Sequence, residues 1–454
     1  RGCFLMNDAL LKIVVAINGI LWGKILIVIL VGCGIFFTIS LKGIQLRKFS
    51  KAFKQAFKGF SLKGEKAGKD GMSSFQSLAT AIAAQVGTGN LAGAATAIVS
   101  GGPGAIFWMW ISAFFGMATI FAEAVLAQLF KKEVNGHVTG GPAYYLRYGL
   151  NSKFLSSFFA VTIVLALGFI GNMVQANSIG TAFESAFHIS PLIVGIVLAI
   201  ISGFIFVGGV ARIASFTEKI VPIMAGFYIL GGIIILVMMG SSTLDAIRQV
   251  FVGAFNPSAV LGGAAGITVK NAIRYGVARG LFSNEAGMGS TPHAHAIAKV
   301  DDPTQQGLVA IVGVFIDTFV VLNISALVII ATGANLSGET GIAVTQKAFE
   351  TGFGAFGLVF VAIALLFFAF STIIGWYFFG EANVKYLFGE KGLTPYRLIV
   401  LAFIVLGTCL HVELVWELAD MFNGIMVIPN VIGLIGLSKL VKQALEKAEN
   451  NNIL

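Results

Sequence analysis

The residues with the clearest chemical potential lie in the middle of the second long apolar segment of the chain. There, Gly87 and Gly89 flank Thr88, and Gln85 and Asn90 lie within two residues of the glycines. Glycine weakens a helix by about 1 kcal/mol relative to alanine, so two glycines this close favour an interrupted helix. Unwound backbone at membrane depth offers N–H groups that bind an anion and carbonyl groups that bind a cation. The alternative is close helix packing through small residues, with nothing bound.

A second interruption is expected near residues 280–289, a run that contains three glycines, Ser283, Asn284 and Glu285. It belongs to the seventh apolar segment, five after the first interruption. Interruptions in corresponding members of two halves indicate an inverted repeat with a binding site near the membrane midplane. Because five is odd, the two five-helix halves must enter the membrane with opposite orientations. This coincidence favours a binding role over packing alone.

The composition shows what must position these residues. The chain has 454 residues, of which 57% are hydrophobic and 11% charged, whereas a soluble domain is about 45–50% apolar and about 25% charged. Mean hydropathy is +0.90, and there are 56 glycines. Polar surface is too scarce to coat a soluble globule of this size. A soluble enzyme is therefore excluded, and an all-α polytopic membrane protein is predicted.

Reading for runs of about 20 mainly apolar residues predicts about eleven membrane spans. Their approximate bounds are 20–41, 74–98, 104–130, 154–183, 191–210, 217–240, 259–282, 305–333, 355–384, 396–411 and 413–438. The run at 259–282 is the weakest, because it contains Lys270, Arg274 and Arg279.

The distribution of positive charge predicts the orientation. The loop 42–73 carries nine Lys/Arg, and alternation from there places 22 Lys/Arg in inside loops and four in outside segments. Cytoplasmic loops carry such an excess, so we expect the N-terminus outside and the C-terminus in the cytoplasm of a multi-pass protein of the plasma membrane. The net charge of +9 then reflects topology, and no nucleic-acid partner is expected.

Peripheral segments are also predicted. Residues 45–60 alternate aromatic residues and lysines at helical steps, which predicts an amphipathic helix on the inner leaflet of the bilayer. A short interfacial helix is expected at 139–150, and the polar tail 439–454 is expected to fray. The resulting organisation has four parts: an N-terminal segment with the first span and the amphipathic helix (1–73), the first five-helix repeat (74–240), the second repeat (241–438) and the cytoplasmic tail (439–454).

Four long motifs are similar to those of the alanine or glycine:cation symporter family. They are Gly87-Thr-Gly-Asn-Leu-Ala-Gly93, Gly102-Pro-Gly104, Gly140-Gly-Pro-Ala-Tyr-Tyr145 and Ala278-Arg-Gly-Leu-Phe-Ser-Asn-Glu-Ala-Gly-Met-Gly289. The resemblance covers nearly the whole chain, from about residue 20 to 438. It implies sodium-coupled uptake of alanine or glycine, proton-coupled in some members. It also implies a LeuT-type five-plus-five inverted repeat with one additional N-terminal helix.

The substrate implied by this resemblance is a small zwitterion, which needs receptors for its carboxylate and its ammonium group. We expect the N–H groups of Thr88 and Gly89, with the Thr88 hydroxyl, to bind the carboxylate. Gln85 and the carbonyl groups freed around it are expected to accept from the ammonium group. In the fourth span, Phe169, Asn172 and Gln175 recur at helical steps and are expected to share one face of the helix. Interhelical hydrogen bonding is the alternative role for the polar residues of this span, among which Asn172 is the preferred substrate contact. The full candidate set is Gln85, Gly87, Thr88, Gly89, Asn90, Phe169, Asn172, Gln175 and Trp376.

A cation site is implied by the same resemblance. In LeuT-type sodium symporters, carbonyls of the first core helix meet two adjacent hydroxyls of the eighth. Here that pattern corresponds to the carbonyls of Ala83, Val86 and Phe368 with the side chains of Ser371 and Thr372. Trp376, one turn beyond Thr372, is then expected to wall the substrate pocket, with lipid-facing or packing contacts as its alternative role.

Ionisable residues inside spans are candidates for function. We expect Arg274 or Arg279 to pair with Glu285 as a gate near the inner mouth. Asp317 and Glu123 are candidates for a second cation site or a proton relay, and Glu381 and Asp420 also lie within spans. His293 and His295 form an HxH motif with no third metal ligand evident nearby in the sequence.

The predicted function is a sodium-coupled symporter that imports alanine or glycine by alternating access, with sodium as the co-transported ion and no organic cofactor. The alternative is a proton-coupled LeuT-type carrier for another small amino acid or related solute. A channel would need a repeated filter, and an intramembrane enzyme would need a nucleophile–base set or metal ligands. Neither pattern is found, no P-loop is present, and no oligomer is predicted.

Overall fold

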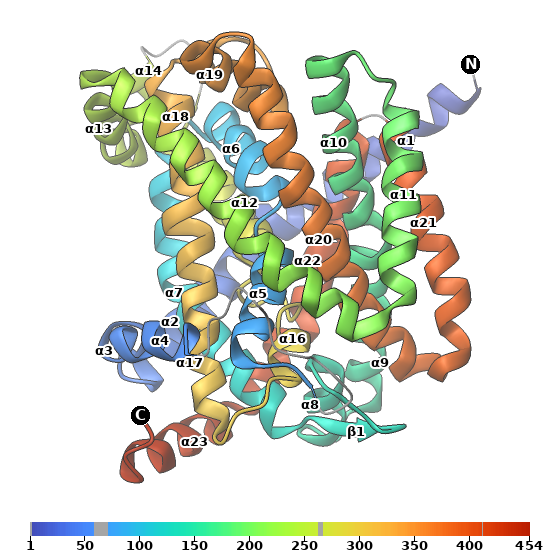
Figure 1. Ribbon diagram of the computed structural model, residues 1–454. Helices are drawn as coiled ribbons and strands as arrows, with labels where there is room; N and C mark the ends of the chain where they lie inside the picture. The colour runs from blue at the N-terminus through green and yellow to red at the C-terminus, as the bar shows by residue number, and fades with distance from the viewer. Residues whose placement is uncertain (1, 59–70, 262–266, 411) are drawn as a thin grey trace.

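The protein is a helical bundle with a single small hairpin in the part that the structure describes. The computed structural model describes residues 2–58, 71–261, 267–410 and 412–454. Its long helices run between two ends (Figure 1). The end that carries α13 (Ser241–Phe255), α14 (Pro257–Leu261) and α19 (Ile342–Phe353) is called the upper end below. The end that carries α4 (Phe49–Ala56) and α23 (Ser438–Asn450) is the lower end.

The N-terminal half of the chain forms the following further elements. They are α1 (Gly2–Ile20), η1 (Leu21–Ile25), α2 (Leu26–Ser40), α3 (Ile44–Arg47), α5 (Ser74–Gln85), η2 (Gly89–Gly93), α6 (Ala94–Gly101), α7 (Ala105–Leu129), β1 (Lys132–Val134), β2 (His137–Thr139), α8 (Pro142–Tyr148), α9 (Lys153–Ile163), η3 (Val164–Gly171), α10 (Asn172–Phe187), α11 (Pro191–Val207) and α12 (Gly209–Met239). Strands β1 and β2 pair antiparallel.

The C-terminal half completes the bundle. Its further elements are α15 (Val269–Asn284), α16 (Pro292–Ala296), α17 (Pro303–Val314), η4 (Phe315–Leu322), α18 (Asn323–Ala331), η5 (Ala334–Leu336), α20 (Phe356–Phe388), η6 (Gly389–Gly392), α21 (Leu393–Cys409) and α22 (Val412–Gly436).

Several segments are long and apolar enough to cross a membrane. Within the described residues there are seven, or eight if the bent pair α5 and η2–α6 counts as one span. One of the seven, Phe356–Cys409, contains both α20 and α21, and α11 is a shorter apolar helix. Outward-facing side chains such as Ile200, Phe204 and Val237 are each more than 65% exposed, as expected where lipid replaces water. The chain is thus an all-α, multi-pass membrane protein, while the number eleven stays a prediction.

The predicted bounds of one span are wrong. The expected span 259–282 is not one helix, because α14 ends at Leu261 and α15 begins at Val269. The side chain of Thr268 caps α15 by accepting from the N–H of Asn271. The helix therefore begins about ten residues later than the apolar run suggests.

The expected amphipathic helix 45–60 is also corrected. Lys48 (φ −112°, ψ 10°) separates α3 from α4, so two short helices replace one. Residues 59 and 60 lie outside the described part of the chain. The ring of Phe49 packs on Phe315, with centroids 4.9 Å apart, so this side chain contacts the bundle.

The tail forms a helix, α23, instead of fraying. Val441, Leu445 and Ala448 are buried along one face of it. The guanidinium of Arg47 lies 2.8 Å from the carboxylate of Glu449. Partial burial acts to raise the pKa of Glu449, but the hydrogen bond and charge of Arg47 outweigh it and hold this pKa below its ordinary value. The tail is therefore tied to α3 at the lower end.

Candidate functional site

The first predicted helix interruption is confirmed. Helix α5 ends at Gln85, the following segment resumes at Gly89, and the two parts are bent by 49°. Val86 has extended backbone (φ −83°, ψ 92°). A Cβ at Gly87 would lie 2.3 Å from Thr372 Oγ1, and one at Gly89 would lie 3.0 Å from Ser283 Cα. Glycine is required here because α20 and α15 approach the unwound backbone directly.

The second interruption is also confirmed. Helix α15 ends at Asn284, and Glu285 adopts a left-handed conformation (φ 58°). The loop that follows is held by Glu123 of α7, whose carboxylate accepts from the N–H groups of Gly287 (3.0 Å) and Gly289 (2.9 Å). These two glycines have φ of 90° and 83°, a region that L side chains rarely adopt. Glu123 thus serves to anchor the break.

Side-chain amides bond to two backbone N–H groups at the first interruption, one of which was expected to bind substrate. The N–H of Gly87 donates to Asn90 Oδ1 (3.0 Å), and the N–H of Thr88 donates to Gln175 Oε1 (3.1 Å). The expectation of a free N–H at Thr88 is therefore wrong in this conformation. Gln85 Nε2 donates to the carbonyl of Asn284 (2.7 Å), so this side chain joins the two interruptions.

The five oxygens expected to form a cation site lie together. Thr372 Oγ1 is 2.9 Å from the carbonyl oxygen of Ala83, 3.3 Å from that of Val86 and 3.0 Å from that of Phe368. Ser371 Oγ is 3.3 Å from the Ala83 oxygen and 2.8 Å from the Phe368 oxygen. Gly375 permits this contact, because a Cβ there would lie 3.0 Å from Cβ of Ala84 on α5.

The fit of this oxygen cluster to a cation follows from its chemistry. Carbonyl and hydroxyl oxygens are ligands that hard cations prefer. All five oxygens come from neutral groups, which suits a monovalent ion better than a divalent one. The carbonyls of Ala83 and Val86 belong to the unwound end of α5, where the helical hydrogen-bond pattern stops. The arrangement can therefore hold a small monovalent cation.

Trp376 lies one turn beyond this oxygen cluster and is 1% exposed. Its indole N–H donates to Glu285 Oε1. Phe282 packs edge-on against the indole, with ring centroids 5.8 Å apart. A Cβ at Gly171 would lie 2.6 Å from the indole ring. Trp376 therefore fills the space between the second interruption and the junction of η3 with α10.

Two predicted residues of the fourth span have different surroundings from those expected. Phe169 points toward α21, where its ring packs on Tyr396 (5.7 Å between centroids) and Phe403 (5.1 Å). Asn172 is fully buried and donates to the carbonyl of Gly168 in its own helix (3.0 Å). The segment Val164–Gly171 has the wider turns of a π-helix, so ordinary helical spacing assigns Phe169 to the wrong face.

Asp317 of η4 forms a polar cluster with both interrupted helices. Its carboxylate accepts from Asn90 Nδ2 (2.7 Å), from Ser283 Oγ (3.0 Å to each oxygen) and from Thr318 Oγ1 (2.9 Å). Asn90 comes from the first interruption and Ser283 from the second. Asp317 therefore lies where the two breaks meet, which the spacing of residues could not indicate.

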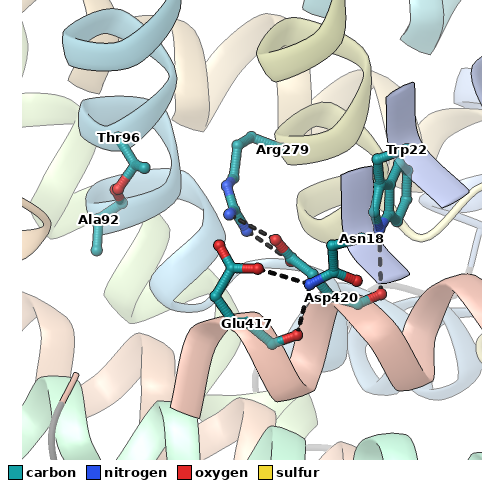
Figure 2. A network of polar contacts seen from close by, with 7 residues as sticks. All are labelled: Asn18, Trp22, Ala92, Thr96, Arg279, Glu417 and Asp420. Atoms are coloured by element: carbon teal, nitrogen blue, oxygen red, sulfur yellow. Dashed lines mark hydrogen bonds and ion pairs between the residues drawn. The ribbon is translucent and has the colours of Figure 1, made fainter. Parts of the chain in front are cut away.

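The expected gate pairing is wrong. Arg279 does not pair with Glu285, because its guanidinium binds Asp420 of α22 through two hydrogen bonds of 2.7 and 2.6 Å (Figure 2). The guanidinium of Arg274 lies over the ring of Tyr275, 5.5 Å from its centroid. Arg279 precedes the break on α15, which descends from the α14 end of the bundle. The ion pair thus lies on the upper side of the break, away from the positively charged loop that follows α2.

The first helix joins the same network (Figure 2). Asn18 Nδ2 donates to the carboxylate (2.7 Å) and the carbonyl (2.8 Å) of Glu417, and the Trp22 indole donates to the carbonyl of Asp420 (3.1 Å). Arg279 also lies over the ring of Trp416, 5.1 Å from its centroid. The N-terminal helix therefore contacts α22 at the turn that holds Arg279.

The two histidines of the HxH motif contact different parts of the protein. His293 Nδ1 lies 2.6 Å from the carbonyl of Ser290, and its Nε2 lies 2.8 Å from Asn383 Nδ2. His295 Nδ1 lies 2.7 Å from Gln306 Nε2. Each imidazole is thus held by a neighbouring polar group.

A pocket of about 350 Å³ opens at the lower end of the bundle. Its lining includes Tyr144 of α8, His293 of α16, and Phe378, Glu381 and Lys385 of α20. The carboxylate of Glu381 pairs with Lys385 at 2.9 Å. Because Phe378 and Glu381 follow Trp376 along α20, this pocket approaches the Trp376 region from below.

Sequence reasoning missed four contributors to the site. Phe282 and Ser283 lie inside the quoted motif of the seventh span, and their place just before Glu285 was the available signal. Gly171 precedes Asn172, which was singled out, and Asp420 was noted only as a charge within a span. Their partners lie far away in the sequence, so local spacing could not reveal them.

Comparisons with known proteins agree with this architecture. The structure resembles the manganese transporter of Eremococcus coleocola, with a TM-score of 0.51 over 79% of this chain and 75% of that one at 13% identity, which supports the fold alone. The chain is 45% identical to the sodium/alanine symporter AgcS of Methanococcus maripaludis over 95% of each chain. It is 43% identical to the probable sodium/glutamine symporter GlnT of Bacillus subtilis, over 97% of this chain and 91% of that one. Residues 7–452 match the family model of these transporters. The chain is therefore a transporter, not an enzyme, and belongs to the sodium:alanine symporter family.

Proposed function

We propose that this protein imports alanine or glycine together with sodium by alternating access. The observation that carries the proposal is the cluster of five oxygens between α5 and α20, with Thr372 Oγ1 within 3.3 Å of three carbonyl oxygens. Sodium would bind between the carbonyls of Ala83, Val86 and Phe368 and the hydroxyls of Ser371 and Thr372. Binding there would join the unwound end of α5 to α20.

The amino acid would bind beside this cluster, between the first interruption and Trp376. Thr88 Oγ1 and Asn172 Oδ1 are buried and have no hydrogen-bond partner in the described protein. A hydroxyl can donate to a substrate carboxylate, and an amide oxygen can accept from an ammonium group. A carboxylate would also compete with Gln175 Oε1 for the N–H of Thr88, because charged acceptors form the stronger hydrogen bonds.

The other predicted contacts take supporting parts in this proposal. Gln85 and Asn90 bond to the second interruption and to Asp317, so they would hold the two breaks together. Gly87 and Gly89 would admit the close approach of α20 and α15. Phe169 packs against α21 and is not retained as a substrate contact.

The size of the substrate would be limited by Trp376. The indole is held on three sides by Glu285, Phe282 and Gly171. A rigid aromatic wall leaves little room for a side chain, which favours alanine and glycine over glutamine. One relative is named as an alanine symporter and another as a probable glutamine symporter. The position of Trp376 would therefore decide which of these two amino acids this protein carries.

The transport cycle would follow the repeat organisation, with repeats at 74–240 and 241–438 and the N-terminus outside the plasma membrane. The Arg279–Asp420 pair lies at the last part of α15, just before the second break. The pocket lined by His293 and Glu381 opens below this break. Import would then end with release through this lower pocket toward the cytoplasm.

A proton-coupled carrier is the second candidate, favoured by the buried carboxylates. Glu123, Glu285 and Asp317 are fully buried, and the hydrogen bonds of their carboxylates within the described residues come from neutral donors. A buried carboxylate without a cation nearby is a natural proton acceptor. In this alternative, the coupling ion is a proton bound by one of these carboxylates, in place of a sodium ion bound by the oxygen cluster between α5 and α20.

Uptake of radiolabelled alanine into proteoliposomes separates the two candidates. Purified protein is reconstituted and given an inward sodium gradient, an inward proton gradient or neither. The proposal expects accumulation with the sodium gradient alone. Accumulation with the proton gradient alone supports the alternative, and no alanine uptake under any gradient contradicts the proposal.

A further inference from the structure

Glu285 occupies an unusual place in the second interruption. It ends α15 in the left-handed region (φ 58°), which is a strained conformation for a residue other than glycine. Its side chain is fully buried. One carboxylate oxygen accepts from the indole N–H of Trp376 and the other accepts from Ser290 Oγ. A strained backbone and a fully buried carboxyl group are thus both used to place one side chain.

The contact with Trp376 is specific in its chemistry. An indole N–H can only donate, and the ring of Trp376 offers a single such group. Phe282 and Gly171 contact the carbon edges and faces of the indole, but they offer it no acceptor side chain. Glu285 therefore supplies the directional contact that fixes the rotation of the ring.

Ser290 completes the arrangement from the other side. Its hydroxyl donates to the carboxylate of Glu285. Its backbone carbonyl oxygen lies 2.6 Å from His293 Nδ1. The loop after the break thus holds the second oxygen of Glu285. With both oxygens fixed, the carboxylate has little freedom to rotate away from Trp376.

We propose that Glu285 is a positioning residue that sets substrate size by fixing the indole of Trp376 across the amino-acid pocket. The inference rests on the proposed function for its substrate class, and it gives Glu285 a part in selectivity in place of the gate. The hydrogen bond, and not the negative charge, is what the role requires. A glutamine can supply it, because its amide oxygen accepts from the indole and its amide nitrogen can donate to Ser290 Oγ.

The experiment is a set of matched variants in proteoliposomes: Glu285→Gln, Glu285→Ala, Trp376→Phe and the double variant Glu285→Ala with Trp376→Phe. Selectivity is measured as a ratio. Its numerator is the concentration of unlabelled 2-aminobutyrate that halves radiolabelled alanine uptake, and its denominator is the concentration of unlabelled alanine that does the same. We expect Glu285→Gln to keep the wild-type ratio within about threefold. Glu285→Ala should lower the ratio by about tenfold, the effect of losing one hydrogen bond. In the Trp376→Phe background, Glu285→Ala should add little, because the N–H is already gone.

Two results would overturn the proposal. One is that Glu285→Gln and Glu285→Ala reduce alanine uptake equally while the selectivity ratio keeps its wild-type value in both, which would assign the role to charge. The other is a full additional effect of Glu285→Ala in the Trp376→Phe background. If Glu285→Ala does not yield monodisperse protein, Ser290→Ala replaces it, with an expected shift of the ratio in the same direction and of smaller size.

A second measurement keeps the test independent of the proposed substrate. The fluorescence of Trp376 is obtained as the difference between wild type and Trp376→Phe, without any amino acid present. For Glu285→Ala, the reference is the double variant with Trp376→Phe, and we expect the emission maximum of the difference spectrum to shift. For Glu285→Gln, the reference is the same substitution combined with Trp376→Phe, and we expect the emission maximum to stay unchanged. An unshifted spectrum in Glu285→Ala contradicts the positioning role. Absence of wild-type alanine uptake contradicts only the proposed function.

Discussion

Thr372 of α20 places its hydroxyl oxygen 2.9 Å from the carbonyl oxygen of Ala83, at the point where α5 loses its helical hydrogen bonds. Two segments 289 residues apart thereby share one polar contact inside an apolar bundle. Unwound backbone at this depth is stable only where protein or a cavity surrounds it. The hydroxyls of Ser371 and Thr372 thus donate to carbonyl groups at the break of α5. The same oxygens could serve as ligands for an ion.

Replacing Thr372 by alanine should weaken sodium binding. We expect the sodium concentration for half-maximal alanine uptake to rise at least about tenfold, since a hydrogen bond or contact to a charged group contributes about 1.5–3 kcal/mol. Thr372→Ser should stay within about threefold, because it keeps the hydroxyl. Thr332→Ala is the matched control, since Thr332 bonds only to carbonyls of its own helix. Equal sodium dependence in Thr372→Ala and wild type would rule out this site.

Replacing Trp376 by alanine should widen the range of substrates. Removing the aromatic wall leaves room for longer side chains, and one methylene alone changes selectivity by about 10–200-fold in apolar pockets. We expect unlabelled glutamine to compete with radiolabelled alanine at least about tenfold better in the variant. Trp108→Ala serves as a control, because Trp108 bonds to Ala254 far from the breaks. A variant that retains the wild-type preference would show that Trp376 does not line the pocket.

Breaking the Arg279–Asp420 pair should destabilise the protein. Both residues are less than 10% exposed, and removal of one partner of a buried pair costs ~3–5 kcal/mol. We expect Asp420→Ala to lower the thermal unfolding temperature in detergent, and the double variant Arg279→Met with Asp420→Leu to recover much of the loss. Asp245→Ala breaks the exposed pair with Arg248 and should leave the unfolding temperature unchanged. Equal unfolding temperatures for Asp420→Ala and Asp245→Ala would contradict the structural role.

The attachment of α23 to α3 should depend on pH. Because the folded pKa of Glu449 lies below its ordinary value of 4.5, the pair with Arg47 contributes fully at pH values above that value. The contribution is lost as pH falls through 4.5 toward the folded pKa. Limited proteolysis of the tail should therefore become faster in mild acid, and the double variant Arg47→Ala with Lys48→Ala, which removes both cations paired with Glu449, should remove this dependence. A tail equally protected at pH 7 and pH 4 would contradict the contact.

Much of this architecture could be predicted from the sequence. Apolar runs located the helices, because a bilayer fixes the length of a span, and paired glycines located both breaks. The adjacent hydroxyls of Ser371 and Thr372 could be matched to the carbonyls of α5 only through the family resemblance. The five-plus-five repeat and the orientation of the termini stay predictions.

Two predictions about the site were wrong, each for a physical reason. Helical spacing placed Phe169 beside Asn172, but the wide turns of Val164–Gly171 rotate it toward α21. Charge pairing was sought near in sequence, whereas Arg279 binds Asp420, 141 residues away. Such partners depend on how the helices pack, which no local pattern encodes.

The most direct test of the central claim is the coupling of sodium to alanine. Entry of radioactive sodium into proteoliposomes is measured with and without external alanine, for wild type and Thr372→Ala. The account predicts that alanine stimulates sodium entry in wild type and that Thr372→Ala loses this stimulation while remaining folded. Alanine entry that proceeds with no accompanying sodium, in wild type, would contradict it.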